Sequence, residues 1–143
     1  MTPPAKGPAM RPMLPLCALV LAATAAAAAD KPMTAAEFDA YSQGKTLYYA
    51  IGGQPYGAET YLPDHRVIWA FLGEACKRGT WYESQGRICF VYEGEGDGPQ
   101  CWTFFSGATG LKAHFEGDPQ AADLIEVKQS DRPLVCHGPR VGV

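Results

Sequence analysis

Between residues 46 and 129 the chain is a succession of short runs in which apolar and polar positions alternate. Alternation with a period of two is typical of strands that bury one face. The runs are rich in aromatic and β-branched residues, and clusters of Gly, Pro, Asp or Ser separate them. The sequence therefore predicts about eight short strands, at residues 46–51, 58–62, 66–72, 79–83, 87–92, 100–105, 111–115 and 124–129.

A different pattern precedes the first strand. Thr34 and Glu37 have the spacing of a capping box, in which the threonine and the glutamate each bond the other's backbone amide. Phe38 supplies an apolar contact in the first turns, and Gly44 can adopt the left-handed conformation that ends a helix. The sequence thus predicts a short amphipathic helix over residues 34–43.

The order of these elements indicates the fold class. Short strands joined by short turns favour an antiparallel meander, which can close into a small barrel or form a strongly curved sheet. Closure removes the exposed edges that invite aggregation. We therefore expect a mainly β protein with one N-terminal helix, and a single domain over residues 30–143.

Two neighbouring strands also predict a register. Residues 87–92 and 100–105 flank a glycine-rich acidic turn, and a hairpin centred on that turn places Cys89 opposite Cys101. The same register places Ile88 opposite Trp102, on a face that collects only apolar and aromatic residues. One alignment thus satisfies both faces of the hairpin.

The cysteines point to an oxidising compartment. Without the N-terminal segment, four remain, and an even number in a small exported chain is typical of two disulfides. The hairpin register favours Cys89–Cys101, which leaves Cys76–Cys136 by elimination. The rival pairing, Cys76–Cys89 with Cys101–Cys136, remains open at this point.

The N-terminus has the pattern of an export signal. Lys6 and Arg11 precede a short apolar core at residues 14–21, and Ala residues at 27–29 satisfy the cleavage rule, which predicts a signal peptide over residues 1–29. The apolar stretch is shorter than the roughly 20 residues of a membrane span, and an uncleaved anchor is the alternative. We expect a periplasmic or secreted protein with no membrane span after cleavage.

Composition and charge narrow the partners. The 143 residues carry a net charge of −3, with 12 Lys and Arg against 15 Asp and Glu. A basic footprint for nucleic acid is absent. The sequence therefore predicts no nucleic-acid partner, and leaves a small ligand or an envelope protein as the expected partner.

Three short motifs resemble those of a known group. Residues 79–81 have the pattern G-x-W, residues 88–90 read I-C-F, and residues 101–102 read C-W. This combination, spanning about residues 66–105, resembles an uncharacterised family of small exported bacterial proteins. The resemblance implies the hairpin architecture and no particular activity. A helix beside a meander is also similar in shape to lipocalin-like barrels, which is an analogy of fold alone.

Familiar catalytic patterns are missing from the sequence. It contains no nucleophile elbow, phosphate-binding loop or zinc-protease motif, and the cysteine spacings fit no zinc site. The run from Glu93 to Gly98 imitates the start of a calcium loop, but Phe104 occupies the place of the final acidic ligand. We predict no catalytic residues, no metal and no cofactor.

The aromatic residues are the candidate binding groups. Large rings can simply fill a small barrel, or they can line a pocket for a glycan or a small apolar ligand. The candidates are Trp69, Trp81, Tyr82, Tyr92 and Trp102. The leading functional hypothesis is a non-catalytic exported binding or envelope-accessory protein. The alternatives are a secreted inhibitor of a hydrolase such as a protease or lysozyme, and a small periplasmic hydrolase.

Overall fold

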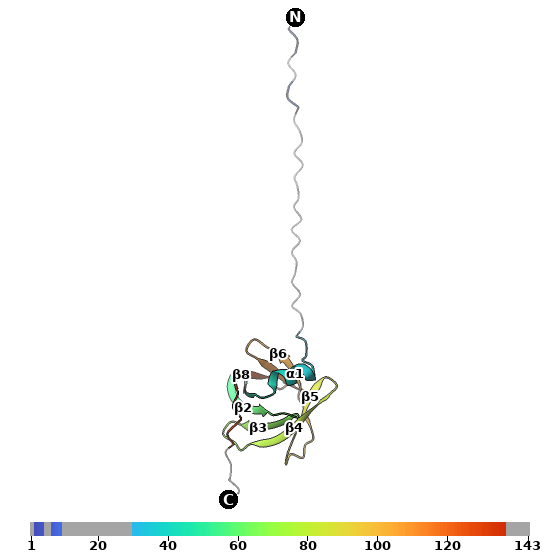
Figure 1. Ribbon diagram of the computed structural model, residues 1–143. Coiled ribbons are helices and arrows are strands. Elements are labelled where there is room, and N and C mark those ends of the chain that lie inside the picture. The colour runs from blue at the N-terminus through green and yellow to red at the C-terminus, as the bar shows by residue number, and fades with distance from the viewer. Residues whose placement is uncertain (1, 5–6, 10–29, 137–143) are drawn as a thin grey trace, which may run out of the picture.

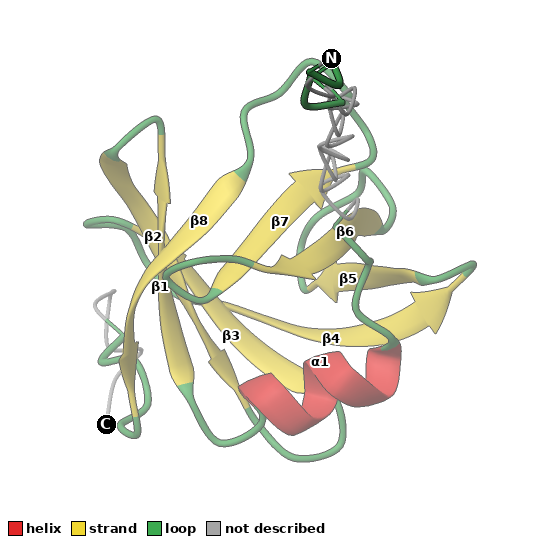
Figure 2. Ribbon diagram, turned by 90° about the horizontal axis from the view of Figure 1, so that it is seen from above, coloured by secondary structure: helices red, strands yellow, loops and turns green. Residues whose placement is uncertain are grey.

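The computed structural model describes residues 2–4, 7–9 and 30–136, and it has one helix followed by eight strands in that part of the chain (Figure 1). Each strand pairs antiparallel with its neighbour in the chain, and the last pairs with the first, so the sheet is a closed barrel (Figure 2). The predicted mainly β class and meander are confirmed. The elements are α1 (Ala35–Ser42), β1 (Thr46–Ile51), β2 (Gln54–Tyr61), β3 (Arg66–Phe71), β4 (Lys77–Ser84), β5 (Arg87–Tyr92), β6 (Gln100–Ser106), β7 (Leu111–Phe115) and β8 (Leu124–Ser130).

Two strands begin earlier than predicted. β2 starts at Gln54 because Gly52 and Gly53, with φ of 55° and 77°, form a tight turn directly after β1. Pro55 lies within this strand, although proline is uncommon inside a paired strand because it has no amide to donate. The pairing of β1 with β2 is irregular at this point, since the register shifts between Tyr49 and Ala50. β4 likewise begins two residues early, at Lys77.

The helix α1 has the predicted N-terminal cap. The Glu37 amide donates to Thr34 Oγ1 at 3.1 Å, and the Thr34 amide donates to the Glu37 carboxylate at 2.8 Å. The helix ends at Ser42, one residue before the predicted end. Phe38 is completely buried and anchors α1 against one end of the barrel. Its ring contacts four others, those of Tyr61, Trp81, Phe90 and Phe104.

The disulfides are those that the pattern favoured. Cys89 pairs with Cys101 across β5 and β6, and Ile88 lies opposite Trp102 in the same register. The second bridge joins Cys76 to Cys136 over a sequence separation of 60 residues. The rival pairing is therefore wrong, and the C-terminal segment is tethered to the chain just before β4.

The predicted signal peptide has its apolar core and cleavage site at positions outside the described residues. Where the chain is described, no helix has both the length and the apolar character needed to cross a membrane.

Candidate binding pocket inside the barrel

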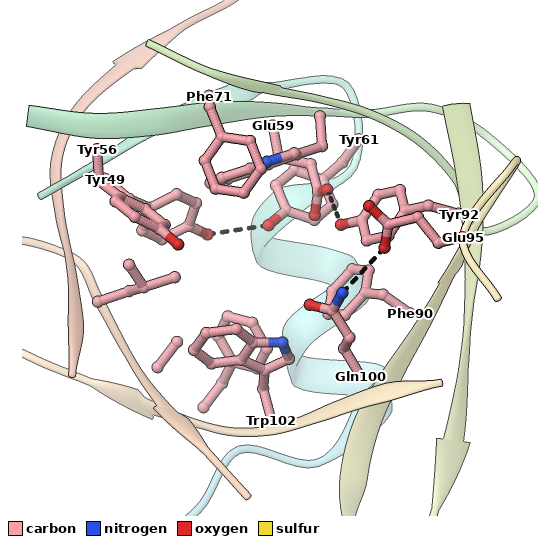
Figure 3. A pocket seen from close by; sticks show the side chains of 14 residues that line it. Tyr49, Tyr56, Glu59, Tyr61, Phe71, Phe90, Tyr92, Glu95, Gln100 and Trp102 are labelled. Carbon is pink, nitrogen blue, oxygen red and sulfur yellow. Dashed lines mark hydrogen bonds between the residues drawn. The ribbon is translucent and has the colours of Figure 1, made fainter. Parts of the chain in front are cut away.

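A pocket lies inside the barrel, and α1 is behind it in the view of Figure 3. The space between its walls is about 530 Å³ when the open mouth is included, and large rings from the surrounding strands crowd its interior. The pocket is therefore narrow. Nine of its lining residues are aromatic, and the full lining is Tyr49, Tyr56, Glu59, Tyr61, Trp69, Phe71, Phe90, Tyr92, Glu95, Gln100, Trp102, Phe104, Ala113 and Leu124.

The floor of the pocket rests on α1. Tyr61, Phe90 and Phe104 line the pocket and also contact the Phe38 ring, with centroid distances of 5.5, 6.4 and 4.5 Å. Edge-on and tilted packing of this kind fixes the ring planes. The helix therefore gives the pocket a rigid closed end.

Two glycines make room for wall rings. A Cβ on Gly57 would lie 2.6 Å from the indole of Trp69, and one on Gly79 would lie 2.7 Å from the ring of Tyr92. Real Cβ atoms essentially never approach so closely. Each ring thus lies directly over the backbone of a neighbouring strand, which only a residue without a side chain permits.

The irregularity in β2 shapes the wall near the mouth. Tyr49 pairs with Gly57 but Ala50 pairs with Pro55, so Tyr56 is an extra residue on β2. A bulge of this kind redirects side chains. Tyr56 lines the pocket and packs edge-on against Phe71 at 5.3 Å between ring centroids.

Glu59 is the buried polar centre of the wall, with only 3% of its surface exposed. The hydroxyl of Tyr92 donates a hydrogen bond to its carboxylate. Burial raises the pKa of Glu59 to about 7, and hydrogen bonds from Tyr92 and Tyr61 oppose that rise only in part. Burial, and then the charge of Glu59, hold the pKa of Tyr92 well above its usual range. Tyr92 is therefore a neutral donor at physiological pH.

A pair of hydrogen-bonded tyrosines extends the polar part of the wall toward the floor of the pocket. The hydroxyls of Tyr49 and Tyr61 are 2.9 Å apart, and both residues are almost completely buried. Burial raises the pKa of both hydroxyls well above the usual value. The wall therefore presents neutral hydroxyls beside one ionisable carboxylate.

At the mouth, Glu95 ties the acidic loop between β5 and β6 to the barrel. Its carboxylate accepts hydrogen bonds from Lys77 Nζ and from Gln100 Nε2, the latter at 3.1 Å. Glu95 is the middle acidic residue of the run from Glu93 to Gly98 that imitates a calcium loop, and it lines the pocket (Figure 3).

The five aromatic residues singled out from the sequence are divided between three places. Trp69, Tyr92 and Trp102 line the pocket, with Trp102 on the wall opposite Glu59 (Figure 3). Trp81 is 4% exposed, contacts Phe38 and stacks on His65 at 3.6 Å between ring centroids. Tyr82 is 43% exposed and is not part of the pocket lining.

Sequence reasoning missed Glu59, Tyr49 and Tyr56 as pocket residues. A glutamate in a strand ordinarily indicates the solvent face, and the predicted strand began after Tyr56. The available signal was the spacing of Glu59 and Tyr61, which places both on one face of the strand.

Two histidines lie in the described region, and neither lines the pocket. His114 Nδ1 is 2.8 Å from the Asp123 carboxylate, and both side chains are about one-third exposed. His137 lies outside the described residues. Over residues 30–136, no three His, Cys, Asp or Glu side chains are grouped in a way that could hold a metal ion.

The fold and the pocket together define a small closed up-and-down barrel, stabilised by two disulfides, with an internal aromatic cavity. Comparisons of this chain with known protein families, with curated proteins and with solved structures found no match.

Proposed function

We propose that this protein is an exported, non-catalytic binding protein that takes a small ligand into the barrel. The observation that carries the proposal is the aromatic pocket with a closed floor and an open mouth. Pockets for small molecules are typically concave and apolar, with a few polar groups that fix the orientation of the ligand. The disulfides are consistent with a periplasmic or extracellular location.

The polar groups of the pocket support binding through their mutual hydrogen bonds. Tyr92 holds Glu59, and Tyr49 pairs with Tyr61, so these groups are oriented before a ligand arrives. Preorganised groups lower the entropic cost of binding. The narrow interior favours a slender or flat ligand that enters between the rings at the mouth. The inhibitor and hydrolase hypotheses remain alternatives.

The proposal is tested by a ligand panel read by tryptophan fluorescence and thermal shift. Trp69 and Trp102 line the pocket, so an occupant should change their emission. A ligand found in this way should lose about tenfold or more in affinity in a Tyr56→Ala variant, because a ring at the mouth is removed. The matched control is Tyr82→Ala, on an exposed tyrosine outside the pocket. Equal losses in both variants would contradict the proposed site.

A further inference from the structure

The lining of the pocket has an unbalanced charge. It contains two carboxylates, those of Glu59 and Glu95, and no Lys, Arg or His among the described lining residues. Lys77 comes near the mouth, where Glu95 binds its ammonium group. In the described part of the chain Glu59 has no such basic partner, since the hydrogen bonds to its carboxylate come from the neutral hydroxyls of Tyr92 and Tyr61. Among the residues that the structure describes, the inner pocket therefore has an ionisable acid without a countercharge.

Aromatic rings line the same pocket. The Tyr56 ring lies 5.9 Å from that of Trp69, and the Phe71 ring is almost perpendicular to both, at 89°. The Tyr49 ring completes this group at 6.4 Å from Trp69. These rings pack edge-on or tilted against one another and form an aromatic wall of the pocket. The electron-rich face of an aromatic ring attracts an organic cation.

We infer that the ligand carries an alkylammonium group, which enters the pocket along this aromatic wall and pairs with the carboxylate of Glu59. This inference rests on the proposed function and specifies the ligand class for the same pocket. A buried charge is tolerated only when it is paired, and an entering ammonium supplies the missing partner. The narrow interior admits one slender cationic chain more readily than a bulky one.

The experiment compares two probes of equal length, n-butylammonium and 1-butanol, on the full chain. Binding is measured by tryptophan fluorescence and by NMR shifts at a pH of about 8, above the Glu59 pKa of about 7. We expect n-butylammonium to bind about tenfold or more tightly than 1-butanol, since only the cation gains the interactions with the rings and the carboxylate.

The variant Glu59→Gln keeps the shape of the side chain and removes its charge. We expect it to weaken n-butylammonium binding about tenfold or more and to leave 1-butanol binding unchanged. The control Glu93→Gln changes an exposed acid of the neighbouring loop and should alter neither affinity by more than about twofold. Circular dichroism and a melting curve verify that each variant is folded.

The outcomes separate this inference from the proposed function. If 1-butanol binds as tightly as n-butylammonium, the cation inference is wrong while binding in the pocket stands. If n-butylammonium does not bind the wild-type protein, the inference is also wrong, and the broader ligand panel decides the proposed function independently. Should Glu59→Gln fail to fold, the comparison of the two probes on the wild type still decides the inference.

Discussion

At the residue scale, Glu59 couples protonation to stability. In the unfolded chain its pKa is near 4.5, whereas burial raises the folded value to about 7. Between these values the folded protein binds more protons than the unfolded chain does, so the free energy of unfolding falls as the pH rises through this window. The difference between the two pKa values corresponds to about 3 kcal/mol of unfolding free energy, which is lost once the pH has risen above 7.

Urea denaturation at a series of pH values between about 4 and 8 measures this loss. In Glu59→Gln the side chain does not titrate, so the fall of about 3 kcal/mol should disappear. The matched variant Glu93→Gln removes an exposed carboxylate and should retain the fall. A pH dependence that is the same in both variants would contradict the assignment to Glu59.

The glycine beneath Trp69 provides a second test at this scale. Gly57→Ala would place a Cβ 2.6 Å from the indole and from the backbone oxygen of Ala70, so either the ring or the strand must shift. Overpacking of this kind costs about 1–3 kcal/mol, measurable by chemical denaturation. Gly96→Ala is the control, because a Cβ there meets nothing within 4 Å. Equal stability of the two variants would show that the Trp69 ring is not fixed over β2.

At the scale of elements, the strand alternation predicted the barrel order because turns of Gly, Pro and Asp separate nearly every pair of strands. The register of β5 and β6 was predictable because the apolar face and the cysteine pair required the same alignment. The orientation of Trp81 was not predictable from the sequence, since it depends on the turn between Ser84 and Arg87. That turn has two residues and no bulge, so Trp81 pairs with Phe90 and faces inward.

The interior of the pocket was harder to predict for a different reason. The inward position of Glu59 opposes the rule that acids face water, and it is tolerated because Tyr92 donates a hydrogen bond to it. Tyr56 reaches the wall through an irregularity in the pairing of β1 and β2. Both features depend on contacts between strands, which the pattern within one strand does not contain.

The helix α1 is expected to depend on its contact with the barrel. A helix of eight residues is marginal on its own, so Phe38 must supply most of its stability. We predict that Phe38→Ala lowers the free energy of unfolding by about 3–5 kcal/mol, whereas Thr34→Ala, which removes only the cap, costs about 1 kcal/mol. Denaturation curves of the two variants measure the difference. A Phe38→Ala cost no larger than that of Thr34→Ala would mean that α1 is not anchored through this ring.

At the scale of the whole molecule, the two disulfides differ in their access to solvent. Cys89 is 1% exposed within the barrel wall, while Cys136 lies on the exposed C-terminal segment. Exchange with a thiol requires access to a sulfur atom. We therefore predict that limited reduction, followed by alkylation and peptide mapping, labels Cys76 and Cys136 before Cys89 and Cys101.

The two bridges should follow the same order in their contributions to the free energy of unfolding, measured by removing one bridge at a time. Replacing Cys76 and Cys136 by serine opens the loop that spans 60 positions and should cost about 4 kcal/mol, against about 3 kcal/mol for the 12-position loop of Cys89 and Cys101. The bridge that is reduced first is therefore expected to have the larger effect on stability. Loop length sets how far a bridge restricts the unfolded chain, whereas solvent access in the folded protein sets how quickly the bridge is reduced. Mild reduction should therefore lower the melting temperature of the protein while the β5–β6 bridge is still intact. A melting temperature that falls only when Cys89 and Cys101 become labelled would contradict this separation.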